Sequence, residues 1–308
     1  MGDTTGIAWT DSTFVPWVGC TKVSPACANC YAEQAKPTKQ HEVRWGPGQP
    51  RHRTGPDNWR KPARWNREAE AAGVRRKVFC LSLGDWLDPE VPVEWLVGLL
   101  RLIGKTPNLD WQLLTKRPEL WFERMCAVRA SPEYEADVIA WVCDWVTLGA
   151  APANVWVGTT VEDQQRADER IPALMHIPAR VRFLSCEPLL EAIDLFGARY
   201  EINGGKQGAI GPWGGVNWVI CGGESGDKAR PFNLGWARSL RDQCASAGVS
   251  FFMKQVGDNA YTVETDYEEC GGAPVGRSVT ERYLSKAHHG ADPAEWPEEL
   301  RIRQFPTV

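Results

Sequence analysis

The chain has 308 residues, of which 43% are hydrophobic and 24% charged, and its formal net charge is −4. No run approaches the roughly 20 apolar residues that cross a bilayer, and residues 1–12 lack the basic and apolar regions of a secretion signal. We therefore expect a cytoplasmic protein with no membrane partner, long enough for one large core or two modest domains.

Short apolar runs rich in β-branched and aromatic residues predict seven strands, at 13–18, 77–83, 110–115, 154–160, 181–186, 216–221 and 249–255. Helical patterns lie between most of them, at 91–104, 119–129, 133–148, 162–176 and 234–247. Strands that are apolar throughout and alternate with helices indicate an α/β fold with a parallel sheet. We predict a partial (β/α) barrel of the TIM type with about six or seven strands; an open doubly wound sheet is the alternative.

Three segments depart from this alternation. Residues 36–76 form a basic insertion after the first strand, and residues 191–215 are rich in glycine and predict a loop or hairpin in place of a helix. Residues 258–308 are polar, and we expect an irregular C-terminal extension packed on a barrel formed by residues 1–257.

The basic insertion concentrates positive charge. Residues 41–77 contain ten Lys and Arg against four Asp and Glu, which gives +6 locally and −10 over the remainder. Trp45, Trp59 and Trp65 lie among the basic residues. This composition suits a phosphate-bearing ligand, so residues 44–77 are predicted to contact a nucleotide, DNA or RNA. The alternative is a solvated segment whose charges pair with acidic groups elsewhere in the fold.

Three of the ten cysteines, Cys20, Cys27 and Cys30, are clustered in the segment G-C-TKVSPA-C-AN-C-Y. Most of the others stand singly in apolar runs, as buried thiols do in a cytosolic protein. Three thiolates can bind three irons of a cubane cluster and leave the fourth iron open to a ligand. The structural alternative is a zinc site completed by His41, His52 or another thiol.

Polar residues follow the predicted strands at corresponding positions. Because the carboxyl ends of barrel strands converge at one mouth, we expect these residues to share a pocket with the cysteines. They are Ser82, Asp85, Thr115, Lys116, Arg117, Thr159, Thr160, Glu162, Ser185, Glu187, Glu224, Ser225, Lys254 and Gln255. The alternative is that each caps the helix that follows, for which Ser82 and Thr160 are candidates.

Two features of these strand ends carry specific chemistry. Gly222 and Gly223 would let backbone amides approach a ligand, and Glu224 would bind an amine or ribose hydroxyls. The segment lacks the Gly-Lys-Ser/Thr ending of a phosphate loop, which argues against ATP hydrolysis by that route. Lys116 and Lys254 would bind anions or form imines, unless they make salt bridges to glutamates at neighbouring strand ends.

A three-cysteine loop after the first strand of a parallel barrel resembles the radical S-adenosylmethionine superfamily. More narrowly, most of residues 6–257 is similar to a three-cysteine family found in bacteriophages and prophage-rich bacterial genomes. The motifs that carry this similarity are W-T-D-S-T-F-V-P-W-V-G-C, C-A-N-C-Y-A-E, L-L-T-K-R-P, V-G-T-T-V-E, L-S-C-E-P-L and C-G-G-E-S-G. The chain departs from the superfamily pattern in having six residues between the first two cysteines rather than three, and Asn29 where an aromatic residue usually precedes the third.

The resemblance implies a [4Fe-4S] cluster on Cys20, Cys27 and Cys30, with S-adenosylmethionine on the open iron and an electron donor such as flavodoxin or ferredoxin. Cleavage of S-adenosylmethionine would give a 5′-deoxyadenosyl radical that modifies or repairs a nucleotide, a nucleic acid or another phosphorylated substrate. The candidate cofactor-binding residues are Tyr31, Ser82, Asp85, Thr115, Thr159, Glu162, Ser185, Gly222, Gly223 and Glu224, and the candidate catalytic residues are Lys116, Glu187 and Lys254. Among them, Tyr31 is the candidate contact to adenine and Asp85 to the methionine amine. The alternative is a zinc- or iron–sulfur-stapled nucleic-acid-binding accessory protein without catalysis.

Overall fold

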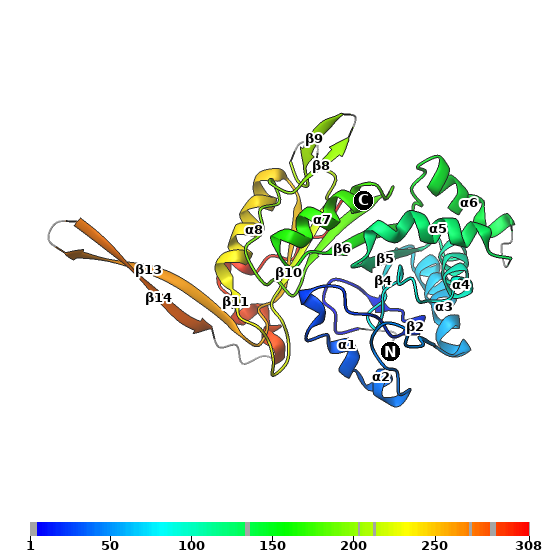
Figure 1. Ribbon diagram of the computed structural model, residues 1–308, viewed down its shortest axis with the longest axis horizontal. Coiled ribbons are helices and arrows are strands. Elements are labelled where there is room, and N and C mark those ends of the chain that lie inside the picture. Colours follow the sequence, from blue (N-terminus) through cyan, green and yellow to red (C-terminus); the bar gives the residue numbers. More distant parts are fainter. Residues whose placement is uncertain are drawn as a thin grey trace.

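The computed structural model describes residues 5–132, 136–202, 204–211, 214–270, 273–283 and 288–307, and a seven-stranded parallel sheet lies at its centre (Figure 1). The sheet order follows the chain: β1 (Ser12–Thr13), β4 (Arg76–Cys80), β5 (Leu109–Thr115), β6 (Val155–Thr160), β7 (Val181–Cys186), β10 (Trp218–Gly222) and β12 (Ser250–Gln255). Each strand is added at the same edge, and the twisted sheet curls into a half-barrel. The predicted α/β class and parallel sheet are confirmed.

Helices connect the strands and cover the outer face of the sheet. They are α3 (Pro56–Ala72), α4 (Val93–Gly104), α5 (Trp121–Ala130), α6 (Ala136–Thr147), α7 (Gln164–Met175) and α8 (Leu234–Ala247). Asp163, rather than Thr160, caps α7 by accepting from the N–H of Arg166 (2.7 Å), so the capping alternative for Thr160 is wrong. Within the described ranges, no helix is both long and apolar enough to cross a bilayer.

Side chains alternate between the two faces of each strand and build two cores. The outer faces of the strands pack beneath the helices in the larger cluster. The concave face is filled by aromatic side chains around Trp218, whose ring lies edge-on to Trp156 (centroids 6.1 Å apart) and Phe252 (5.9 Å). Several of the sixteen tryptophans are therefore core residues, which accounts for much of their number without a base-stacking role.

The predicted first strand is interrupted. Only β1 joins the main sheet, and β2 (Trp17–Val18) pairs antiparallel with β3 (His52–Arg53) of the basic insertion. Pro16 has no N–H for a ladder, and the Val15 carbonyl accepts from the Thr54 hydroxyl (2.9 Å) and the Asn58 amide (2.9 Å). The insertion thus draws this segment out of the sheet.

Two hairpins project from the half-barrel in Figure 1. The predicted loop or hairpin at 191–215 contains β8 (Arg199–Ile202) and β9 (Gly205–Gly208), as expected. The C-terminal extension differs from the irregular segment that we expected: β13 (Ala260–Cys270) and β14 (Ala273–Tyr283) form a long antiparallel hairpin, joined at its base by β11 (Phe232–Asn233). After it, the chain returns to the sheet edge, where the Met253 N–H donates to the Ile302 carbonyl (2.8 Å).

Candidate functional site

Residues 19–31, which we call the cysteine loop, cross the carboxyl ends of the sheet strands and lead into the short helices α1 (Tyr31–Gln34) and α2 (Lys36–Gln40). The Gly19 N–H donates to the Leu83 carbonyl just beyond β4 (3.0 Å). Gly19 has φ +118°, a backbone conformation that suits glycine. The three thiols of the loop are free, and each is at least partly buried. The loop therefore begins at the mouth of the half-barrel, where the strand-end residues were expected to converge.

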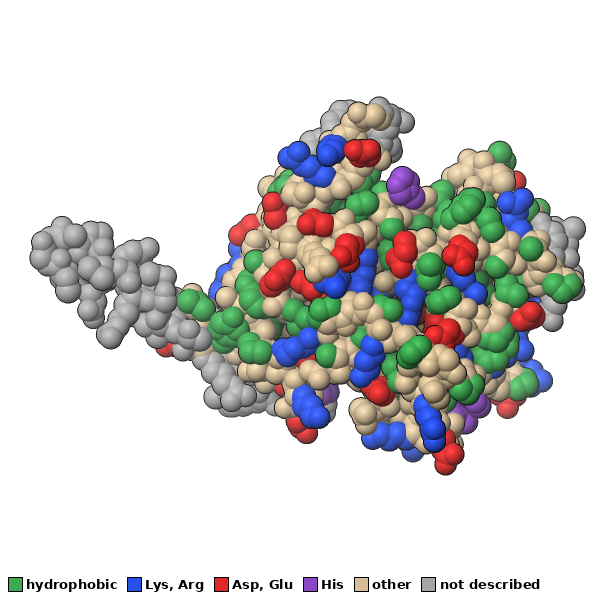
Figure 2. All heavy atoms as spheres, in the orientation of Figure 1, with side chains coloured by type: hydrophobic (Ala, Val, Ile, Leu, Met, Phe, Trp, Pro, Cys, Tyr) green, Lys and Arg blue, Asp and Glu red, His purple; other side chains and the backbone are tan. Residues whose placement is uncertain are grey.

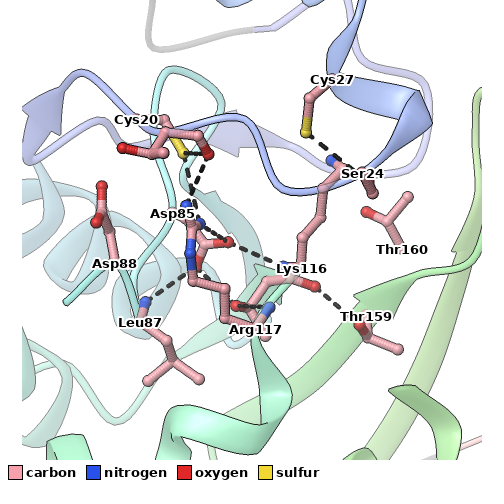
Figure 3. Close-up of polar contacts among 12 residues, drawn as sticks. Cys20, Ser24, Cys27, Asp85, Leu87, Asp88, Lys116, Arg117, Thr159 and Thr160 are labelled. Atoms are coloured by element: carbon pink, nitrogen blue, oxygen red, sulfur yellow. Dashed lines mark hydrogen bonds and ion pairs between the residues drawn. The ribbon is translucent and has the colours of Figure 1, made fainter. Parts of the chain in front are cut away.

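Asp85 and Arg117 form a buried ion pair beneath the start of this loop (Figure 3). Arg117 Nη1 lies 3.1 Å from Asp85 Oδ2, and both residues are almost inaccessible to solvent. Arg117 Nη2 donates to the Thr21 carbonyl (2.7 Å), while Nη1 also approaches Cys20 Sγ (3.5 Å). The Asp85 carboxylate further accepts from the Thr115 hydroxyl (2.7 Å) and from two backbone N–H groups, so its acceptor sites are filled.

The thiol of Cys20 is held in its protonated form in this environment. Burial, followed by the negative charge of Asp85, raises its pKa to about 12, although Arg117 acts in the opposite direction. The thiol donates to the Thr21 carbonyl (3.5 Å) as it accepts from Arg117. A bound cation would reverse this balance and favour the thiolate.

Glu162 and Arg170 hold the middle of the loop. Glu162, fully buried after β6, accepts from Arg170 Nη1 at 2.8 Å through one carboxylate oxygen. Its other oxygen accepts from the Ala26 N–H at 3.2 Å. The predicted strand-end glutamate thus contacts the backbone beside Cys27.

Glu224 and Arg230 hold the far side of the loop. Arg230 Nη2 and Nε donate to the two Glu224 oxygens (2.6 and 2.9 Å), and its Nη1 donates to the Pro25 carbonyl (2.8 Å). The Asn29 amide donates to Glu224 Oε2 (3.1 Å). Burial opposes ionisation of Glu224, but the hydrogen bonds from Arg230 and Asn29 outweigh it and lower the carboxyl pKa.

The basic insertion supplies a fourth pair. Arg51 Nε lies 2.9 Å from Asp88 Oδ2, and both side chains are fully buried. Arg51 Nη2 donates to the Thr21 hydroxyl (2.8 Å). Four arginine–carboxylate pairs, Asp85–Arg117, Asp88–Arg51, Glu162–Arg170 and Glu224–Arg230, therefore fasten the cysteine loop to the mouth.

The remaining polar candidates occupy the same strand ends. Lys254 Nζ makes an ion pair with Glu187, so the salt-bridge alternative is confirmed for Lys254. Lys116 is half-buried, and its ammonium has no hydrogen bond or ion pair within the described residues. In Figure 3 its side chain runs from the end of β5 toward Ser24 of the cysteine loop.

Other candidates contact one another through hydrogen bonds. The Tyr31 hydroxyl donates to the Ser82 carbonyl (3.0 Å), and the Thr159 hydroxyl donates to the Thr115 carbonyl (2.9 Å). Gly223 lacks space for a side chain because an added Cβ would lie 2.3 Å from the Val256 carbonyl oxygen. This glycine therefore permits a close approach of backbone segments. Gly222, Gly223 and Ser185 are all buried near the mouth.

The basic insertion is largely neutralised within the fold. Arg60, Arg64, Arg75, Arg76 and Lys77 each lie within ion-pair distance of an aspartate or glutamate. Of the three tryptophans of the segment, one is completely buried and none is exposed. These contacts favour the alternative in which the basic residues of the segment pair with acidic groups of the fold rather than with a bound ligand.

Among the described residues, no group of three or more His, Cys, Asp or Glu side chains is arranged to hold a metal ion. The thiols of the cysteine loop thus lie on one loop without forming a gathered ligand set. His41 and His52, the residues considered for a zinc site, stack on each other with ring centroids 4.1 Å apart.

Of the arginines that complete the four pairs, Arg117 was among the strand-end residues predicted from the sequence and Arg51 lay in the predicted basic segment, whereas Arg170 and Arg230 were not predicted as site residues. Arg170 lies within α7, Arg230 follows a turn, and Arg51 belongs to the insertion. The sequence signal for Arg170 and Arg230 was their spacing, since they follow the strand-end glutamates Glu162 and Glu224 by eight and six residues.

Residues 4–291 match the model of the family described as protein of unknown function DUF5131, and the chain belongs to this family. No curated protein and no solved structure matches the chain.

Proposed function

We propose that this chain is an iron–sulfur enzyme of the radical S-adenosylmethionine type, acting on a nucleotide, a nucleic acid or another phosphorylated substrate. In this proposal the half-barrel is a partial TIM-type barrel over residues 1–257, and residues 258–308 are an extension. The observation that supports the proposal best is the cysteine loop itself, which four buried or partly buried ion pairs fasten over the strand ends.

The three thiols of the cysteine loop are chemically suitable ligands for an iron–sulfur cluster. Cys20, Cys27 and Cys30 are soft ligands on one short loop, and none is consumed by a disulfide. Because the thiols are not gathered in the described conformation, cluster binding requires the side chains to turn toward one centre. When bound, the reduced cluster would supply the electron that cleaves S-adenosylmethionine to methionine and a 5′-deoxyadenosyl radical.

The chain's own residues position the loop and shield the mouth. Arg117 donates a charge-assisted hydrogen bond toward Cys20 Sγ, which partly opposes the rise in the thiol pKa caused by burial and by Asp85. The aromatic cluster closes the concave face below the mouth and excludes water from it. Lys116, Glu187 and Lys254 remain the candidates for contact with the substrate.

Anaerobic reconstitution with iron and sulfide tests the proposal. We expect a brown protein with about four irons per chain, and an electron paramagnetic resonance signal of the reduced cluster that changes when S-adenosylmethionine is added. Reduction with S-adenosylmethionine present should release 5′-deoxyadenosine. Replacing each cysteine of the loop by alanine should abolish the signal, whereas Cys126→Ala on α5 is the matched control and should retain it.

Well-folded protein that binds no iron and releases no 5′-deoxyadenosine would contradict the proposal. One zinc per chain, with tight binding of DNA or RNA and none of S-adenosylmethionine, would instead favour a metal-stapled nucleic-acid-binding protein.

A further inference from the structure

Three hydrogen-bond donors form a row across the concave face at the mouth. The β5–β6 register pairs Leu114 with Gly158 and Thr115 with Thr159, so Lys116, the first residue after β5, comes next to Thr160, the last residue of β6. The β6–β7 register pairs Thr160 with Ser185. The row Lys116, Thr160 and Ser185 therefore crosses three neighbouring strands.

Strand alternation places this row on the concave side. Trp156 on β6 and Phe183 on β7 belong to the concave aromatic cluster, and Leu114 on β5 packs against it. Residues an even number of positions further along the same strand share that face. The three donors thus lie above the aromatic cluster and below the cysteine loop.

The donors of this row lack partners in the described part of the chain. Thr160 is 1% exposed, and its Oγ1 is buried with no hydrogen bond. A buried hydroxyl without a partner is costly, and each such group in a folded protein calls for an explanation. The Lys116 ammonium is likewise unpaired among the described residues, and in Figure 3 the Lys116 and Thr160 side chains both lie near Ser24.

The charges around the row leave one cation uncompensated. The carboxylates Asp85, Glu162, Glu187 and Glu224 each have an arginine or lysine partner, as described above. Acidic and basic side chains also alternate across the middle of the molecular face in Figure 2. Lys116 is the cation at these strand ends that has no carboxylate partner among the described residues, so a bound anion would complete the balance.

We propose that Lys116, Thr160 and Ser185 form a subsite for an anionic group, a phosphate or a carboxylate, of the molecule on which the proposed enzyme acts. An ammonium and two hydroxyls are donors that one tetrahedral or planar anion can accept from together. This inference rests on the proposed function for the identity of its ligand as a substrate, and on the geometry alone for the anion site.

Titration of the iron-free chain with inorganic phosphate and, separately, with acetate tests the subsite by calorimetry. We expect saturable binding of one anion, which identifies the group, and Lys116→Met should weaken it about tenfold or more. Thr160→Val keeps the side-chain shape and should also weaken it. Lys105→Met, at the end of α4, is the matched control and should bind as the unchanged chain does. Absence of saturable binding, or unchanged affinity in both the Lys116 and Thr160 variants, overturns the inference.

S-adenosylmethionine binding to the reconstituted protein separates this inference from the proposed function. We expect Lys116→Met to bind S-adenosylmethionine normally while losing the anion. If both ligands weaken equally, the row serves the cofactor and the inference fails, although the proposed function survives. If no cluster forms but anion binding still depends on Lys116, the anion site stands and the proposed function fails.

Discussion

Replacing Arg117 by methionine tests whether its ion pair holds the cysteine loop. The variant leaves Asp85, which is 5% exposed, without its counter-charge and removes the donor to the Thr21 carbonyl. Removing one partner of a buried ion pair costs about 3–5 kcal/mol. We therefore expect the free energy of unfolding to fall by about that amount.

Urea denaturation followed by tryptophan fluorescence measures the loss, because several tryptophans become exposed on unfolding. Arg238→Met is the matched control: Arg238 pairs with Glu299 at 2.8 Å, but these side chains are 34% and 43% exposed, and such pairs contribute about 0–1 kcal/mol. Equal losses in the two variants would refute the reasoning. Adding Asp85→Asn to Arg117→Met should restore part of the stability, since the two changes are coupled.

Three further predictions concern the anchoring of the loop and the core. Gly19→Ala should lower the free energy of unfolding by about 1–3 kcal/mol, because φ of Gly19 is +118° and the new Cβ would lie 2.9 Å from Arg51 Cδ. Gly55→Ala is the control and should change the denaturation midpoint little, because the space around Gly55 is open. Trp218→Ala should lower the free energy of unfolding by about 3–5 kcal/mol in the same assay. A loss no larger than that of a surface substitution would show that the concave aromatic cluster does not stabilise the fold as a hydrophobic core. The pKa of Glu224 is lowered in the folded state, so its ionised carboxylate stabilises the fold above about pH 4.3, and this stabilisation is lost as the pH falls through the folded pKa. Glu224→Gln should therefore make the free energy of unfolding depend less on pH on the acid side. An unchanged pH dependence would contradict this assignment.

The sheet was predictable because its strands are apolar throughout and its helices have clear end signals. Gly248, for example, ends α8 in the left-handed conformation, and Asn233 caps the start of that helix. The predicted first strand, 13–18, is longer than the observed β1 because residues 17 and 18 pair with the insertion, about 35 residues away in the sequence, and not with the main sheet. The hairpin β13–β14 was missed because its strands are polar, although two glycines between them are a hairpin signal.

The candidate site was predictable to the extent that strand ends converge. Asp85, Glu162 and Glu224 were selected for their positions after strands, and each contacts the cysteine loop or the arginine that holds it. The sequence could not reveal that these carboxylates already have arginine partners, since each pairing depends on how a helix or turn packs back on the mouth. Asp85 has its acceptor sites filled, so its predicted contact with an amine requires one of these hydrogen bonds to be exchanged.

The four ion pairs raise the question of why the cysteine loop is held by charged side chains and not by apolar contacts. Apolar side chains of similar volume often stabilise a fold as well as a buried ion pair does, so stability alone does not explain the arrangement. A guanidinium group differs in having several donors in a fixed plane, and here these donors fix particular backbone atoms, the carbonyls of Thr21 and Pro25. Those two atoms lie near the two ends of the segment between Cys20 and Cys27, so the pairs fix the positions of those ends. The fold itself therefore holds the backbone of the loop in place, and Lys116 keeps no partner among the described residues that would compete with the anion of the proposed subsite.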